Sequence, residues 1–470
     1  MARPSSRYSK PRALVLLFVH LLIAAHITHF LISGRTLAPL ELNESLHTIH
    51  GGVLTAGFLL LVLSLLSTLL FGRFFCGWGC HLIAIQDAST WILGRLGIPA
   101  RPFRSRALTL VPLGFLGYLF VWPQLTRVLA GGEHPGLRIV ESGQGWSSFS
   151  TNDFFRNLPP LDVAVSTLVA CGFLTVLILG NRGFCRLACP YGALFALIDR
   201  FALRRIVLDG DCSGCGKCTA ACNSDVRVHE ELVRHGRVID SGCLKDLDCV
   251  SACPTKAIRL GRSSPALRHG PALIQSLVQV GVRRSAELSL AEELLTGLAF
   301  LAAFLATRGL YDLVPITLAL GLGVMTGWAA SLVFRLATKP RVDFRKLRLK
   351  RATGLTRLGK GLGVFVALWF SFVAHSAWVR FHDFEADRLI RSMTRANRRS
   401  TLGAAAEHLE LTLEHGLVRP TSSLKKLASA YAALGRSQEA AVILREILIR
   451  NPSDEEAARR LRTSTGVAHE

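Results

Sequence analysis

Seven cysteines in a short hydrophilic stretch have the spacing of iron–sulfur ligands. They form two runs that share the register 1-4-7-11. The first run fills every position, with Cys212, Cys215, Cys218 and Cys222. The second run has Asp246 at position 4 and cysteines at the other three, which are Cys243, Cys249 and Cys253. Thiolates are soft, anionic ligands for iron, and this spacing ending in Cys-Pro is that of bacterial ferredoxins.

In the ferredoxin pattern, the fourth cysteine of each run ligates the cluster of the other run. We therefore predict one [4Fe–4S] cluster held by Cys212, Cys215, Cys218 and Cys253. The second cluster is predicted to have the ligands Cys222, Cys243, Asp246 and Cys249. Because a carboxylate is a harder ligand and more easily lost, this cluster is either [4Fe–4S] with an oxygen ligand or [3Fe–4S]. Zinc, which takes four ligands in separated pairs, fits two interlocked runs poorly.

Four further cysteines form a C-x3-C pair in each half of an internal repeat. Residues 72–80 read GRFFCGWGC and residues 181–189 read NRGFCRLAC, each after an apolar segment. Because residues i and i+4 share a helix face, each pair suits joint ligation or disulfide formation. An arginine (Arg73, Arg182) precedes each pair and favours the thiolate form if it lies close in space. The alternatives are one four-thiolate centre, two dithiol pairs, or inert buried thiols at Cys76, Cys80, Cys185 and Cys189.

The composition indicates a membrane protein. The mean hydropathy is +0.37 and 50% of the residues are hydrophobic, which is too apolar for a soluble enzyme. About 20 residues of helix cross the hydrocarbon core of a bilayer. Seven segments are predicted to do so, the fifth of them weakened by three glutamates: 13–32, 51–71, 107–126, 161–180, 286–307, 314–337 and 361–378.

Basic residues alternate between the loops, as the positive-inside rule requires. This places the N-terminus in the cytoplasm and the C-terminus outside, so the net charge of +22 reflects topology and predicts no nucleic-acid partner. Eleven of the twelve cysteines then lie at the cytoplasmic face, where thiols stay reduced. The exception is Cys171, inside the fourth span.

The predicted fold class is an all-α polytopic membrane protein with about seven helices, a small inserted α+β two-cluster ferredoxin module and a helical tail. Four domains are expected: 1–205 with the repeat, 206–262 with the clusters, 263–379 with three further spans, and 380–470 outside the cytoplasm. Residues 271–282 are apolar but short, and are predicted to be interfacial. The tail fits one tetratricopeptide repeat or a plain helical hairpin, and is expected to bind a protein.

Histidines near the outer leaflet are a third group of candidates, because polar groups in a bilayer are costly and often functional. His26, His29 and His50 are candidates for a quinol headgroup site or for haem ligation. The ordinary alternative is interfacial histidines hydrogen-bonded to backbone or water. A quinone is a candidate ligand, and haem is not expected.

At this point the chain resembles the polyferredoxin-like membrane iron–sulfur proteins, which include NapH-, NosR- and CcoG-type members. The resemblance covers about residues 10–262, and its most specific parts are the ferredoxin runs and residues 75–80 and 185–190. The chain departs from the family at His81, where proline is usual, and at Asp246. The resemblance implies electron transfer between quinone and redox partners.

We predict a membrane-bound iron–sulfur protein of the bacterial inner membrane that passes electrons between the quinone pool, or another membrane donor, and a redox partner. No nucleotide or flavin motif is present, so a redox subunit is expected rather than a self-sufficient enzyme. One alternative is an assembly or metal-reducing factor for a respiratory metalloenzyme. The other is a membrane redox sensor.

Overall fold

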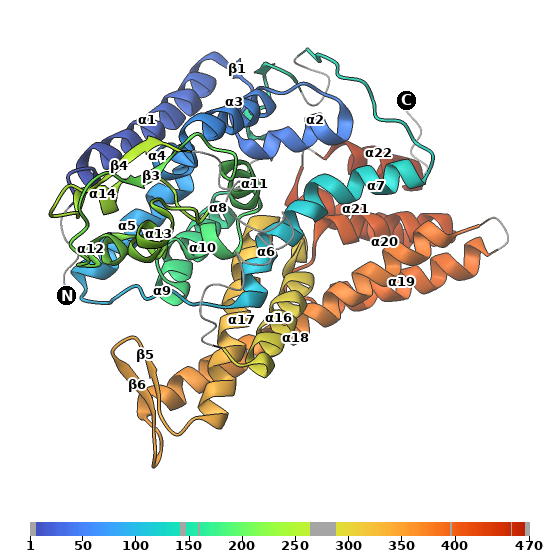
Figure 1. Cartoon of the computed structure of the whole chain (residues 1–470). Helices are drawn as coiled ribbons and strands as arrows, with labels where there is room; N and C mark the ends of the chain where they lie inside the picture. Colours follow the sequence, from blue (N-terminus) through green and yellow to red (C-terminus); the bar gives the residue numbers. More distant parts are fainter. Residues whose placement is uncertain are drawn as a thin grey trace. The chain divides into compact units, whose positions relative to one another are not determined.

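The structure is a computed structural model that describes residues 6–141, 147–157, 160–263, 288–394, 397–452 and 454–465. It is mostly helical, with small sheets of two or three strands (Figure 1). The chain divides into two compact units. The first comprises residues 1–297, 330–334 and 343–347, and the second comprises residues 298–329, 335–342 and 348–470.

Six of the described helices are long and apolar enough to cross a membrane, which supports a polytopic membrane protein. Two of them contain a π-helical turn: α6 (Arg106–Leu116), η2 (Gly117–Val121) and α7 (Trp122–Leu129) are continuous, as are α8 (Leu161–Leu168), η4 (Val169–Leu174) and α9 (Thr175–Leu179). The other four are α1 (Ser9–Ser33), α16 (Leu290–Thr307), α17 (Ile316–Thr338) and α18 (Arg357–Ser392). The predicted interfacial stretch 271–282 lies outside the described residues.

The segment predicted as the second span, 51–71, differs from a continuous helix. Its first residue, Gly51, ends α2 (Ser45–Gly51), residues 52–55 are not helical, and the rest forms the 16-residue α3 (Ala56–Phe71). Gly52 ends α2 with a φ of +71°, and a Cβ there would lie 2.5 Å from the carbonyl oxygens of Pro135 and Gly136. Because α3 is shorter than the roughly 20 residues of a full span, it is not among the six long apolar helices.

The internal repeat is visible as the same pair of helices in each half. The first half has α4 (Phe74–Trp78) and α5 (His81–Arg95), and the second has α10 (Gly183–Leu187) and α11 (Pro190–Asp199). In each half, the first cysteine of the C-x3-C pair lies on the short helix and the second is the N-cap of the longer helix. The repeat therefore places all four thiols at helix junctions.

The cysteine-rich insert is closed by two antiparallel strands. Strand β3 (Arg204–Leu208) pairs with β4 (Ile258–Arg262), with Arg204 opposite Arg262 and Leu208 opposite Ile258. Between them lie α12 (Lys217–Ala221), α13 (Val228–His235) and α14 (Asp248–Ser251). Buried aliphatic side chains fill the space between these elements: Ile206, Val226, Val228, Leu232, Val238 and Ile258.

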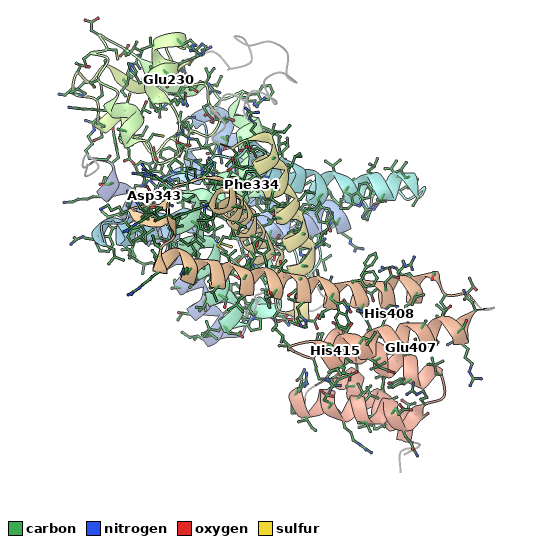
Figure 2. The ribbon with its side chains drawn as sticks, turned by 90° about the horizontal axis from the view of Figure 1, so that it is seen from below. Glu230, Phe334, Asp343, Glu407, His408 and His415 are labelled. Atoms are coloured by element: carbon green, nitrogen blue, oxygen red, sulfur yellow. The ribbon has the colours of Figure 1, made fainter. Side chains whose placement is uncertain are left out.

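The tail of the second unit is helical, as expected, and contains α19 (Arg398–His415), α20 (Thr421–Ala433), α21 (Ser437–Arg450) and α22 (Glu455–Thr465). A turn at Gly435, with a φ of +84°, joins α20 to α21. The tetratricopeptide assignment stays a prediction. On α19, His408, which Figure 2 labels, has its Nδ1 2.7 Å from Nδ1 of His382 on α18.

The remaining elements are short. The strands β1 (Thr36–Leu37) and β2 (Ser150–Thr151) pair antiparallel, as do β6 (Leu347–Arg351) and β7 (Gly354–Leu355). A further strand and three 3-10 helices complete the described elements: β5 (Val342–Phe344), η1 (Leu42–Glu44), η3 (Phe154–Asn157) and η6 (Leu310–Asp312).

Candidate iron–sulfur sites

The four cysteines predicted to hold the first cluster line a single small cavity. Cys212, Cys215, Cys218 and Cys253 all border it, together with His229. Cys212 and Cys215 are exposed, whereas Cys218 is buried. The structure therefore brings together four thiols from both runs in the interlocked manner that the register predicts, and this donor set suits an iron–sulfur cluster.

The three cysteines predicted for the second cluster lie together in the core of the insert. Cys243 and Cys249 are buried, and Cys222 packs against the same apolar cluster. Burial raises the pKa of all three thiols, and their neighbouring thiols and Asp246 raise it further for Cys222 and Cys249. Neutral thiols of this kind give up their protons when a metal centre binds, so binding is favoured at higher pH.

Asp246 lies beside these thiols but is engaged by cations. Its side chain is 8% exposed, and its Oδ2 is 2.8 Å from Arg182 Nη1 and 3.6 Å from Arg12 Nη1. The short contact with Arg182 is an ion pair whose angles do not make a directed hydrogen bond. A ligand role for Asp246 stays a prediction. Both arginines that pair with it come from outside the insert.

The four thiols of the C-x3-C pairs converge into one site. Cys76, Cys80 and Cys185 pack against one apolar cluster, and Cys185 interacts electrostatically with Cys76, Cys80 and Cys189. The cluster consists of Leu16, Ile83 and Leu244. Burial raises the pKa of Cys80 to about 12 and that of Cys189 to about 11. None of the twelve cysteines, all of which lie in the described part of the chain, forms a disulfide. This arrangement favours a single four-thiol centre over two separate pairs.

Nitrogen donors surround this four-thiol site. Gln86 Nε2 donates to Cys185 Sγ at 3.3 Å, and the backbone N–H of Gly192 donates to Cys189 Sγ at 3.3 Å. Arg73 Nη2 lies 3.9 Å from Cys76 Sγ. Hydrogen bonds to sulfur stabilise thiolates and tune the reduction potential of a cluster that they ligate. Gln86 carries no motif, so sequence reasoning missed it.

No three His, Cys, Asp or Glu side chains in the described ranges converge closely enough to hold a single metal ion. A single zinc ion gathers four ligands around one point, whereas a cluster distributes its thiolates over several iron atoms.

One turn of the insert lies directly on the four-thiol site. Leu244, which follows Cys243, forms a buried apolar cluster with Leu16 and Ile83, and thiols of the site pack against this cluster. A Cβ at Gly77 would clash with the carbonyl oxygen of Leu244, and Trp78 Nε1 donates to the carbonyl oxygen of Lys245 at 3.0 Å. Gly77 and Trp78 therefore hold the turn that carries Cys243 against the membrane repeat.

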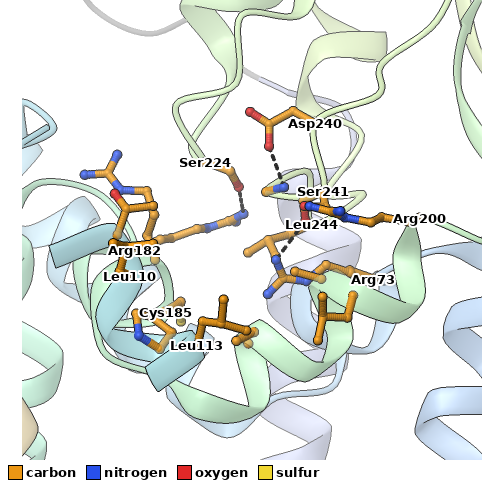
Figure 3. A pocket seen from close by; sticks show the side chains of 18 residues that line it. Arg73, Leu110, Leu113, Arg182, Cys185, Arg200, Ser224, Asp240, Ser241 and Leu244 are labelled. Carbon is orange, nitrogen blue, oxygen red and sulfur yellow. Dashed lines mark hydrogen bonds between the residues drawn. The ribbon is translucent and has the colours of Figure 1, made fainter. Parts of the chain in front are cut away.

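The two repeat arginines reach the insert, in addition to lying near the thiols as the sequence predicts. Arg73 Nη1 donates to the carbonyl oxygen of Ser241 at 2.9 Å, and Arg182 Nη1 donates to Ser224 Oγ at 3.0 Å (Figure 3). Arg182 adopts the left-handed conformation, with a φ of 55°, which is uncommon for a residue other than glycine. Lys245 Nζ in turn donates to Asp199 Oδ1 of α11 at 3.0 Å.

The three candidate histidines all have partners within the chain. His26 Nε2 lies 3.1 Å from the carbonyl oxygen of Leu37, and His29 Nδ1 lies 3.0 Å from Thr36 Oγ1. His50 Nε2 lies 2.9 Å from the carbonyl oxygen of Leu119. These contacts correspond to the ordinary alternative of hydrogen-bonded interfacial histidines, and a quinone or haem role stays a prediction.

Comparison with known proteins supports iron–sulfur binding. A family model described as "4Fe-4S binding domain" matches residues 53–99 and 163–208, the two repeats that carry the C-x3-C pairs. The methylamine utilization ferredoxin-type protein MauN of Methylobacillus flagellatus is 30% identical over 154 residues, which is 32% of this chain and 48% of MauN. The chain thus spans about half the length of that relative.

Two further relatives carry similar descriptions. The ferredoxin-type protein NapH of Haemophilus influenzae is 26% identical over 243 residues, which is 49% of this chain and 73% of NapH. The putative electron transport protein YccM of Escherichia coli is 27% identical over 221 residues, which is 42% of this chain and 54% of YccM. No solved structure matches. These likenesses support electron transfer as the general function, and the chain resembles the polyferredoxin-like membrane iron–sulfur proteins.

Proposed function

We propose that this protein is a membrane-bound electron carrier with three thiol-rich redox sites in contact. Cys212, Cys215, Cys218 and Cys253 would hold one cluster. Cys222, Cys243 and Cys249 would hold a second, with Asp246 as its candidate oxygen ligand. Cys76, Cys80, Cys185 and Cys189 would hold a third centre. A bound iron–sulfur cluster accepts and returns single electrons.

The proposal rests on one observation, which is the packing of Leu244 beside the four-thiol site. Leu244 directly follows Cys243, a predicted ligand of the second cluster. Its side chain belongs to the apolar cluster against which three thiols of the repeat pack. The chain's own contribution is rigid placement. Gly77 and Trp78 hold the turn, and the ion pair of Arg182 with Asp246 ties the insert to the repeat.

The exposure of the cysteines suggests which site a soluble partner would bind. Cys212 and Cys215 are exposed, while the second set of thiols is buried or half-buried. We propose that a soluble redox partner docks at the exposed site and that a quinone, or another membrane donor, exchanges electrons at the membrane repeat. In this proposal the insert is cytoplasmic, the protein resides in the bacterial inner membrane, and the tail lies outside and binds a protein.

Anaerobic iron and sulfide quantitation tests the three sites. Three [4Fe–4S] clusters require about twelve iron atoms per chain, and Cys76→Ser/Cys185→Ser is expected to remove about four of them. Cys171→Ser, which changes a buried thiol of η4 outside the three sites, serves as the control and should leave the iron content unchanged. Full iron retention in the double variant would show that the membrane thiols do not ligate a cluster.

Electron paramagnetic resonance tests the proposed oxygen ligand separately. The wild type should show one all-cysteinyl [4Fe–4S] signal from the insert and a second, different signal, which Asp246→Cys should convert to the all-cysteinyl form. A wild-type insert with two ordinary all-cysteinyl signals would refute the role of Asp246 as a ligand. Electron transfer itself is tested by reducing the protein with a quinol in proteoliposomes, and clusters that stay oxidised would exclude a quinol donor.

A further inference from the structure

A cavity of about 120 Å³ in the first unit lies between a candidate membrane helix, the helix α11 and the insert. One wall comes from α6, with Thr109, Leu110, Pro112 and Leu113. The opposite wall comes from α11, and the roof comes from the insert residues Ser224, Asp240, Ser241, Gly242 and Leu244 (Figure 3). The cavity thus combines side chains from the bilayer region with polar groups of the insert.

The α6 side of the cavity is open to the surroundings. Leu110 is 56% exposed and Leu113 is 37% exposed, although both line the cavity. Because α6 is part of a candidate membrane span, these side chains face lipid when the helix is inserted. An acyl chain can therefore lie against them while its polar end enters the cavity.

The other end of the cavity is rich in guanidinium groups. Figure 3 shows Arg182 and Arg200 reaching toward the middle from opposite sides, with Arg73 below them. Among the residues that line the cavity, the one carboxylate is that of Asp240. The Nε atoms of Arg73 and Arg182 are buried and have no hydrogen-bond partner within the described part of the chain.

Arg200 is a further buried cation at this end of the cavity. It is 7% exposed at the C-terminal end of α11, and burial lowers its pKa even though Asp240 acts in the opposite direction. A buried cation whose pKa falls is stabilised by any anion that enters beside it. Guanidinium groups bind phosphate oxygens through paired hydrogen bonds.

We propose that this cavity binds the phosphate headgroup of an anionic phospholipid, with its acyl chain along Leu110 and Leu113. Phosphate is the shared chemistry of a lipid and of free inorganic phosphate, and the open apolar wall favours the lipid. Basic pockets at the cytoplasmic end of membrane helices recognise anionic headgroups in this way. Because Cys185 also lines the cavity, a bound lipid would exclude water from one side of the four-thiol site.

Native mass spectrometry of the full chain, released from nanodiscs of equal phosphatidylglycerol and phosphatidylcholine, tests the proposal. The wild type should retain phosphatidylglycerol preferentially. Arg200→Gln should reduce that preference about fivefold, the effect of one basic residue near an anionic surface. Arg95→Gln removes an exposed arginine of α5 that lies beside Trp91 and does not line the cavity, so it should leave the preference unchanged.

A second variant removes lipid binding without changing charge. Ala196→Phe fills the cavity and should also abolish the preference, so the test stands if Arg200→Gln fails to fold. Iron content equal to that of the wild type checks the fold of each variant. Equal retention of both lipids, or equal losses in Arg200→Gln and Arg95→Gln, would overturn the proposal. Displacement of phosphatidylglycerol by an equimolar amount of inorganic phosphate would overturn the lipid as the source.

Discussion

The two cysteine sites of the insert share a register and differ in their surroundings. The site of Cys212 and Cys215 is exposed, small and all-cysteinyl. The site of Cys243 and Cys249 is buried and is attached to the membrane repeat through Leu244 and through the ion pair of Asp246 with Arg182. Two runs with one register thus have different surroundings, because the first site keeps accessible thiols and the second lies in the protein core.

The largest expected effect comes from Cys249→Ser compared with Cys215→Ser. Both should lower the iron content of the insert. Because Cys249 is only 5% exposed, the serine that replaces it also places a hydroxyl in an apolar site without a hydrogen-bond partner. This should lower the free energy of unfolding by a further 1–3 kcal/mol or so (about the cost of one unsatisfied buried group) in Cys249→Ser, and not in Cys215→Ser. Iron quantitation and thermal unfolding of both variants measure the difference. Equal losses of stability would remove the distinction between the two sites.

A second effect concerns the attachment of the buried site. Arg182→Gln should destabilise the protein by about 3 kcal/mol, because it leaves the buried carboxylate of Asp246 without its nearest cation. The matched control is Arg104→Gln, whose partner Asp225 is also 2.8 Å away but whose side chain is 24% exposed. A loss of about 1 kcal/mol or less is expected there. Urea unfolding followed by tryptophan fluorescence compares them, and a larger loss in Arg104→Gln would contradict the comparison.

The smallest expected effect is a pH dependence of the insert. Burial and then the nearby Asp240 raise the pKa of Glu231 from 4.5 to about 7. Between these values the folded chain holds a proton that the unfolded chain has released, so stability rises as the pH falls from 8 to 6, by about 1 kcal/mol. Unfolding measured at both pH values should show this in the wild type. Glu231→Gln should remove most of this dependence of stability on pH. If the variant keeps the dependence of the wild type, another group is responsible.

The grouping of the first four ligands could be predicted from sequence because ligand spacing is local and follows a fixed register. The contact between Arg182 and Asp246 could not, since it joins residues far apart in the chain whose approach depends on tertiary packing. The same holds for Gln86, which no motif identifies as a donor to Cys185. The break at Gly52 was missed because hydropathy averages over a window and does not register a positive φ.

The strand pair that closes the insert has a consequence for its history and its use. With Arg204 opposite Arg262, the chain enters and leaves the insert at neighbouring points of one ladder. A segment whose ends adjoin can be gained, exchanged or removed with little disturbance of its host, as in domain insertion generally. In this chain the ends of the insert meet at the β3–β4 ladder, whereas its interior turns are fastened separately to the membrane repeat through Trp78 and Arg182.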